Sequence, residues 1–252
     1  MSATSQPTDF SDLFTDLQNR VRATTGVTAT ENQAKRYINT SLQDIALATD
    51  YKLPWLERRA VLRTHDDYTT GTVDVSIGST TVTGTSSLWT TANSYGENNA
   101  RTTGKMTFAG GSDIYKITTV GSDTSITLTD RWVGTAALDD ATYIYFEDEY
   151  ALATDFLRPS DFQSFSDNFN IPLLSRLEFR RRFPRPNVSG RPRVATLLDI
   201  GFGATTTPVR RVQFYPYPDA VYLIPYTYIT SNLAVSSTGV EAANLSANAD
   251  EP

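Results

Sequence analysis

The middle third of the chain alternates small polar residues with β-branched ones, and this pattern most constrains the fold. In "GTVDVSIGSTTVTGTSSLWTT" (71–91), Val73, Val75 and Ile77 fall on every second residue, so they share one face of an extended strand. Gly78-Ser79 can supply the turn to a returning strand. The stretch therefore predicts a β-hairpin of small residues, with no group suited to catalysis.

Similar alternation and glycine-rich turns continue to about residue 147. Six short strands are expected, at 72–77, 80–84, 105–109, 114–120, 125–130 and 142–147. Short strands at this spacing predict a small antiparallel barrel or sandwich. Its core is expected to contain Trp89, Phe108, Tyr115, Ile117, Ile126, Leu128 and Trp132.

Helical periodicity flanks the β region. Apolar residues at helical spacing predict helices over 9–24 and 30–48, the second opened by a capping box of Thr30 and Gln33. "LLSRLEFRRRF" (173–183) predicts a third helix, which Pro184 closes. Strands return at 193–200, 210–215 and 220–229.

These elements together predict an α+β fold. An N-terminal helical hairpin and the third helix would form a bundle, with an inserted small antiparallel β barrel or sandwich and C-terminal β strands. The expected parts are 1–64 (helical hairpin, first part of the core domain), 65–147 (inserted β domain), 148–233 (return to the core domain) and 234–252 (C-terminal tail).

Composition excludes several classes of protein. The 252 residues include no cysteine, so neither disulfides nor thiolate metal sites are expected. No apolar run approaches the length of a membrane span, and the N-terminus lacks the pattern of a secretory signal. The net charge of −6 disfavours general affinity for nucleic acid or anionic membranes.

The charges are unevenly distributed along the chain. Residues 139–167 carry eight acids and one base, whereas residues 176–211 carry nine arginines and two acids. Arginine binds carboxylates with two parallel hydrogen bonds and is enriched at interfaces. We therefore expect contacts between copies of the chain, with DNA contact and a solvated face as alternatives. The expected interface residues are Arg176, Arg180, Arg181, Arg182, Arg185, Arg191, Arg193, Asp148, Glu149, Asp155 and Asp161.

No catalytic, cofactor-binding or metal-binding set can be assembled, and no cofactor is expected. His65 is the single histidine, and "RTHDDY" is interpreted as a solvated loop. Adjacent acids such as Asp66-Asp67 and those of "FEDEY" are interpreted as solvated as well. "GFGATTT" (201–207) lacks the Gly-Lys-Ser/Thr ending of a phosphate loop.

Three stretches, in this order, resemble the head–tail adaptor (connector) proteins of tailed bacteriophages. The first is 71–91, which is similar to a recurrent Val-Thr-Gly-Thr-x-x-Trp motif of that family. The second is "DEYALATDFLRP" (148–159), in which Ala153 stands where the family usually has proline. The third is "VQFYPYPDAVYLIPYTYI" (212–229).

The resemblance implies a non-enzymatic virion protein of the neck, assembled in the host cytoplasm. It implies a homo-oligomeric ring, typically of twelve copies, that docks on the portal protein and receives a tail, nozzle or neck protein. Double-stranded DNA would pass non-specifically through the channel during genome ejection, with Asp139, Asp140 or Glu147 nearer open surface. No membrane partner is expected.

Two other classes stay open. The first is a β-rich phage fibre, decoration or carbohydrate-binding module, in which Trp89, Tyr95 and Trp132 would form an aromatic platform for sugars. The second is a carboxylate-based hydrolase that uses residues such as Asp66 or Glu149.

Overall fold

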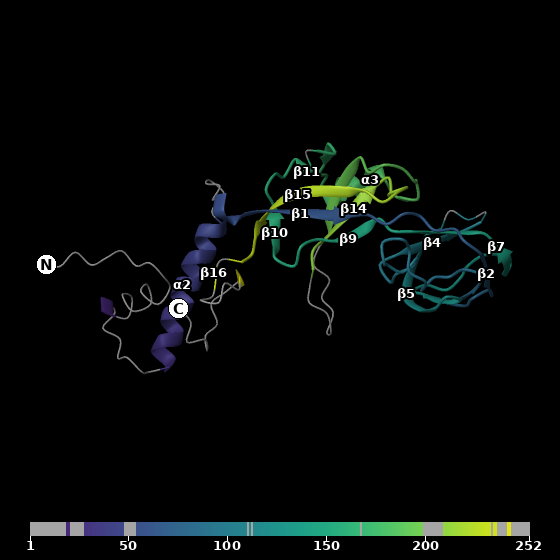
Figure 1. Ribbon diagram of the computed structural model, residues 1–252, viewed down its shortest axis with the longest axis horizontal. Helices are drawn as coiled ribbons and strands as arrows, with labels where there is room; N and C mark the ends of the chain where they lie inside the picture. The colour runs from purple at the N-terminus through teal and green to yellow at the C-terminus, as the bar shows by residue number, and fades with distance from the viewer. Residues whose placement is uncertain are drawn as a thin grey trace. The chain divides into compact units, whose positions relative to one another are not determined.

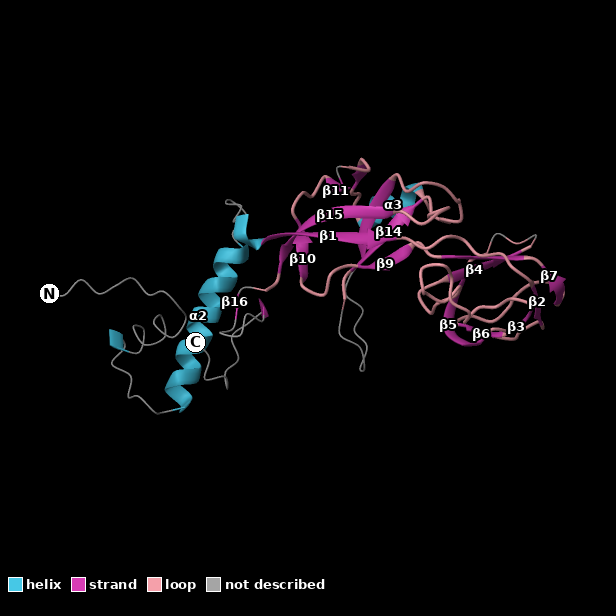
Figure 2. Cartoon of the chain, in the orientation of Figure 1, coloured by secondary structure: helices cyan, strands magenta, loops and turns pink. Residues whose placement is uncertain are grey.

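The structure is a computed structural model (Figures 1 and 2). It describes residues 19–20, 28–47, 54–109, 111, 113–166, 168–198, 209–232, 234–235 and 241–242. The chain divides into two compact units. The larger comprises Arg59–Thr154 and Asp161–Thr227, and the smaller comprises Met1–Arg58, Asp155–Ser160 and Tyr228–Pro252.

Seven strands of the larger unit form one curled sheet, in the order β7-β2-β3-β6-β5-β4-β8 (Figure 1). Their bounds are β2 Thr72–Val75, β3 Thr81–Thr85, β4 Lys105–Phe108, β5 Tyr115–Ser122, β6 Ser125–Leu128, β7 Leu138–Ala141 and β8 Tyr143–Phe146. The two end strands β7 and β8 are separated in the chain by Thr142 alone, yet β7 pairs with β2 and β8 pairs with β4. One continuous segment therefore joins the two ends of the sheet, which is why the sheet curls.

The interior of this sheet confirms the predicted core. All seven expected residues are buried, and Trp89 is fully inaccessible. Its indole Nε1 donates to the Tyr143 hydroxyl at 2.9 Å, so its polar group is satisfied inside the sheet. The rings of Phe108 and Tyr115 each lie about 5.5 Å from the Trp132 ring. Period-two alternation places Phe108 and Tyr115 on the inner face, while Trp89 and Trp132 enter the interior from connecting segments.

A second sheet, in the order β13-β14-β9, follows the curled sheet in the same unit. It consists of β9 Glu149–Ala151, β13 Val194–Leu198 and β14 Arg211–Tyr215, with the short pair β11 Ser164–Ser166 and β12 Ile171–Pro172 nearby in the chain. Aromatic side chains fill its core. The Phe214 ring lies 5.8 Å from that of Tyr150 and 5.5 Å from that of Phe165, which stacks on Tyr226 at 5.1 Å.

The third sheet has the order β1-β15-β10, with bounds Glu57–Arg63, Leu223–Thr230 and Phe156–Pro159. Within the smaller unit, Leu56 and Ile229 are buried together against Leu157. The Asp155 carboxylate accepts hydrogen bonds from the hydroxyls of Tyr228 at 2.8 Å and Thr230 at 2.7 Å. These bonds fix the start of β10 against the end of β15.

The remaining elements are few. The predicted second helix is confirmed as α2, Thr28–Leu47. A 3-10 turn η1 spans Pro54–Leu56, α3 spans Arg176–Arg182, and β16 Ala234–Val235 pairs with β17 Glu241–Ala242. The expected helix over 9–24 lies outside the described residues, apart from helical residues 19–20, and so does the loop 201–207. Neither described α-helix combines the length and apolar character of a bilayer span.

The predicted fold class, α+β with a helical bundle and an inserted β domain, is wrong. In the described part of the chain the fold is mostly strand, with two α-helices and a curled seven-stranded sheet (Figure 2). The third helix has seven residues and packs against β13, and it buries Phe179 while Leu177 stays exposed. A bundle needs longer apolar stripes than one buried residue supplies. The segment 148–233 instead builds its core from aromatic strand residues.

Close packing of glycine backbone against core rings gives a direct test of this interior. A Cβ built on Gly104 would lie 2.1 Å from the Tyr145 ring, whereas one on Gly121 would be in ordinary contact, 3.6 Å from Ser125 O. We expect Gly104→Ala to lower the free energy of unfolding by about 1–3 kcal/mol, because it overpacks a rigid ring. Urea denaturation measures the change, with Gly121→Ala as the matched control. Equal midpoints for the two variants would contradict the packing.

Candidate subunit interface

The arginine segment, defined here as residues 176–193, begins with the anchored helix α3. Ser175 caps α3, since its Oγ accepts from Glu178 N at 3.3 Å. Phe179 is buried, and Phe183, just past the last helical turn, stacks on Tyr215 with ring centroids 3.8 Å apart. Two aromatic rings therefore hold the helix on the second sheet, and its charged side chains point outward.

All seven predicted arginines of this segment are exposed: Arg176, Arg180, Arg181, Arg182, Arg185, Arg191 and Arg193. Some have neighbours within the chain. Arg182 pairs with Glu178 at 2.6 Å one helical turn away, and Arg191 lies over the Phe169 ring at 4.9 Å. Arg185 approaches Asp113 at 3.9 Å, with both side chains more than half exposed.

Arg180, Arg181 and Arg193 have no carboxylate within ion-pair distance among the described residues. Exposed pairs of the kind that Arg182 makes contribute little to stability, because water screens them. The segment therefore presents a dense positive surface that folding itself does not require.

The predicted acidic residues lie in different surroundings. Asp148 is completely buried, and its Oδ1 lies 2.7 Å from Lys105 Nζ. The same ammonium group donates to Glu149 Oε1 at 2.7 Å. Gln213 Nε2 donates to Asp148 Oδ2 at 2.7 Å, which joins β14 to the group. Asp148 and Glu149 thus neutralise a buried lysine of β4.

Burial and charge oppose each other in this cluster. Burial raises the pKa of Asp148 and outweighs the attraction of Lys105. Burial also disfavours charge on Lys105, but Asp148 and Glu149 raise the pKa of its ammonium above the usual value. For Glu149, Lys105 overcomes the cost of burial and lowers the pKa. The cation is therefore the feature on which the two carboxylates depend.

The other two predicted acids are also placed by the fold. Asp155 bonds Tyr228 and Thr230, as described above, and is half-buried. Asp161 is exposed, and its Oδ1 accepts from Gln163 N at 2.8 Å in a turn. The predicted arginines thus lie on one exposed segment. Asp148, Glu149 and Asp155 instead bond partners within the same chain.

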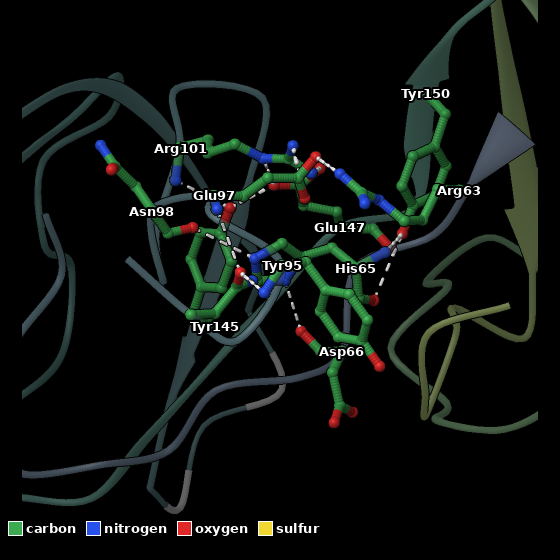
Figure 3. A network of polar contacts seen from close by, with 11 residues as sticks. Arg63, His65, Asp66, Tyr95, Glu97, Asn98, Arg101, Tyr145, Glu147 and Tyr150 are labelled. Carbon is green, nitrogen blue, oxygen red and sulfur yellow. Dashed lines mark hydrogen bonds and ion pairs between the residues drawn. The ribbon is translucent and has the colours of Figure 1, made fainter. Parts of the chain in front are cut away.

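A second polar network, which sequence reasoning missed, surrounds the lone histidine (Figure 3). Arg101 binds Glu147 with two parallel hydrogen bonds, Nε to Oε1 and Nη2 to Oε2, each 2.7 Å long. Tyr145 also donates to Glu147, and Arg63 pairs with Glu97 at 2.5 Å. Burial opposes the charge of Arg101, but Glu147 raises the pKa of the guanidinium. The expectation that Glu147 lies near open surface is wrong, because Glu147 is only 2 % exposed.

His65 is buried in this network, so its interpretation as a solvated loop residue is wrong. Its Nδ1 lies 2.6 Å from Asp66 O and its Nε2 lies 3.2 Å from Asn98 O. Its backbone N–H donates to the Tyr150 hydroxyl at 3.1 Å, and that hydroxyl donates to Glu147 O at 3.0 Å. Through its ring and its backbone N–H, His65 thus links the end of β1, the loop before β4 and β9. Both ring nitrogens lie at hydrogen-bond distance from backbone carbonyl oxygens.

Other predicted sites can also be placed. Trp89 and Trp132 are buried in the curled sheet, so they form no exposed platform with Tyr95, which lies beneath Arg63 at 5.5 Å. Among the described residues, no group of three or more histidine or carboxylate side chains is arranged to hold a metal ion.

Comparisons with known proteins yield no match. No protein-family model, no curated protein and no solved structure matches this chain.

The buried lysine can be tested directly. Lys105→Met would leave the Asp148 carboxylate buried without its cation, and we expect it to lower the free energy of unfolding by about 3–5 kcal/mol. Adding Asp148→Asn should recover part of that loss, because it removes the unpaired charge. Urea unfolding of the two variants measures both effects. A loss below about 1 kcal/mol for Lys105→Met would refute the assigned role.

A second prediction concerns alkaline pH. Burial, followed by the charge of Glu147, raises the pKa of Tyr145 well above its ordinary value of 10.0. Above about pH 10 an unfolded chain loses this proton while the folded chain keeps it, so stability falls as pH rises. Tyr145→Phe should make the alkaline decline in unfolding free energy shallower by about 1.4 kcal/mol per pH unit. Urea unfolding at several pH values from 9.5 to about 11 checks the slope. Identical slopes would contradict it.

Proposed function

We propose that this protein is a structural subunit of a bacteriophage head-to-tail adaptor. In this proposal identical copies form a ring in the virion neck, between the portal protein and a tail protein, around the channel for double-stranded DNA. The ring would be built in the host cytoplasm, and we expect twelve copies. The protein would act as a connector and not as an enzyme.

The observation that carries the proposal is the arginine segment. Seven exposed arginines occupy eighteen positions on a surface that aromatic anchors hold rigidly. Because the backbone of α3 is already fixed, binding has to order only the side chains. Charge complementarity of this kind orients partners and sets their register, even where each exposed pair is weak. A contact between two different flanks of identical subunits closes into a ring when the rotation allows it.

The resemblance to adaptor proteins supports the phage assignment, and it now rests on β segments alone. The stretch 71–91 contains β2, β3 and the core residue Trp89, the stretch 148–159 contains β9 and β10, and the stretch 212–229 runs from β14 into β15. The helical bundle that the resemblance also implied is absent from the described part of the chain and gives no support.

The overall negative charge fits passage of DNA through a channel. Tight phosphate binding by arginine would retard a moving duplex. In the proposal the arginines contact protein, and exposed acids such as Asp139 and Asp140 lie on surfaces that DNA can pass.

Native mass spectrometry and electron microscopy of the full chain, alone and with a portal protein, test the proposal. A closed ring of one defined mass is expected. A chain that stays monomeric under both conditions would overturn it.

Reversing charge on the arginine segment tests the interface. Arg180→Glu with Arg181→Glu should abolish ring assembly and leave the unfolding midpoint unchanged, because both side chains are exposed. Arg181→Glu and Arg131→Glu form a matched pair, since each removes one exposed arginine and adds one acid. Only the first should weaken assembly, as measured by sedimentation. Unchanged assembly in the double variant would refute the placement of the interface.

A further inference from the structure

A small pocket with both apolar and polar lining residues lies beside the arginine segment. Its volume is about 250 Å³, and its apolar wall consists of Phe162, Leu173, Leu174 and Leu197. The two leucines before α3 are held beside β13, since Leu174 N donates to Ala195 O at 2.8 Å. Pockets for whole small molecules usually measure about 300–1,000 Å³, so this volume suits one or two side chains of a larger partner.

The surroundings of the pocket extend this apolar surface. Phe162 at its edge is 62 % exposed, and Leu177 on α3 is 61 % exposed. Large apolar side chains left open next to a hollow are typical of a binding surface.

A buried hydroxyl also lines the pocket. Thr196 is 1 % exposed, and its Oγ1 has no hydrogen-bond partner among the described residues. Buried hydroxyls are rarely left unsatisfied, because each costs the free energy of lost hydration. Thr196 therefore contributes a polar residue to the lining of the pocket.

The charge around the pocket defines the rest of the occupant. Arg176 lines it, and Arg180 lies one turn further along α3. Arg180 and Arg181 are exposed on the same helix, so positive charge lies near the pocket. The complementary partner is a peptide segment with two large apolar side chains and several carboxylates.

The chain contains a segment of this chemistry outside the described residues. "TDFSDLFTDL" (8–17) has two phenylalanines, two leucines and three aspartates, and no base precedes Arg20. At 100° per residue, the helical spacing places Phe10, Leu13, Phe14 and Leu17 on one stripe. The aspartates Asp9, Asp12 and Asp16 then fall together on one flank of that stripe.

Other acidic segments match less well. Glu147, Asp148 and Glu149 are already paired with bases inside the chain. The segment 243–252 has one large apolar residue, Leu245, whereas the segment 8–17 has four. The stretch 8–17 is therefore the better complement.

We propose that residues 8–17 of one copy bind as a helix in this pocket of a neighbouring copy. Phe10 and Phe14 would fill the hollow, and the aspartate flank would face Arg180 and Arg181. The inference rests on the proposed function, because a ring gives each copy one donor segment and one acceptor pocket. Apolar anchors of an amphipathic helix in a groove are a common mode of recognition, and repetition around a ring strengthens each weak contact.

Because the chain has no cysteine, engineered thiols report this contact without background. Full-length Phe10→Cys and Leu197→Cys chains, carrying different tags, are mixed under assembly conditions and oxidised mildly. We expect a disulfide between the two tagged chains, and Phe10→Cys mixed with Val133→Cys, an exposed control position, should give none. A single chain that carries both Phe10→Cys and Leu197→Cys should give a ladder of linked multimers.

Charge exchange provides an independent arm. Asp12→Arg with Asp16→Arg should reduce the yield of the disulfide about tenfold, and Arg180→Asp with Arg181→Asp in the acceptor chain should restore it. Restoration would identify charge complementarity as the cause, because two unrelated folding defects would not correct each other.

The outcomes separate the two proposals. Intact rings without the disulfide would overturn the helix-in-pocket contact and leave the adaptor proposal standing. A disulfide found only within single chains would overturn the exchange between copies. A wild-type chain that stays monomeric, with and without portal protein, would overturn both.

Discussion

The buried ammonium group of Lys105 is the interaction on which the larger unit depends. The chain leaves the curled sheet through three successive acids, Glu147, Asp148 and Glu149, and all three lie where water is scarce. Lys105 pairs with the last two, Lys116 also approaches Glu149 at 3.9 Å, and Arg101 pairs with the first. Buried carboxylates without such partners would cost several kcal/mol each. The acidic connection between β8 and β9 is therefore stabilised by Lys105 of β4 and by Arg101 of the loop before it.

Because these ion pairs join different elements, they also set the register between them. Gln213 brings β14 to Asp148, and His65, Tyr145 and Tyr150 connect the end of β1 to the same region. Buried polar groups that are bonded to specific partners permit few alternative arrangements of the elements that carry them. The acids near residue 148 form ion pairs inside the chain, so their negative charge does not offset the arginines of α3.

The arginine segment illustrates how packing directs charge outward. Phe179 and Phe183 contact each other, and Phe183 stacks on Tyr215. This side of the segment faces the sheet, so the arginines remain exposed to solvent. Arg180, Arg181 and Arg193 have no acidic partner among the described residues. In our proposal the neighbouring copy supplies one to Arg180 and Arg181, and the pocket beside α3 gives the contact an anchor that charge alone would lack. Apolar anchors provide most of the affinity at such contacts, while charges orient them.

Local pattern determined six of the seven strands of the curled sheet, the helix α2 and the aromatic core around Trp89, but it did not predict β7. Alternation and capping depend only on neighbouring residues, so a single sequence reveals them. The pattern likewise predicted an exposed arginine segment. It did not reveal that His65 and Glu147 are buried, because burial of a polar residue depends on partners such as Arg101 and Asn98 that lie more than 30 positions away. The helical bundle was predicted wrongly for the same reason. Whether "RLEFRRR" joins a bundle or covers a sheet is decided by long-range contacts with β13 and Tyr215, and only the tertiary structure contains them.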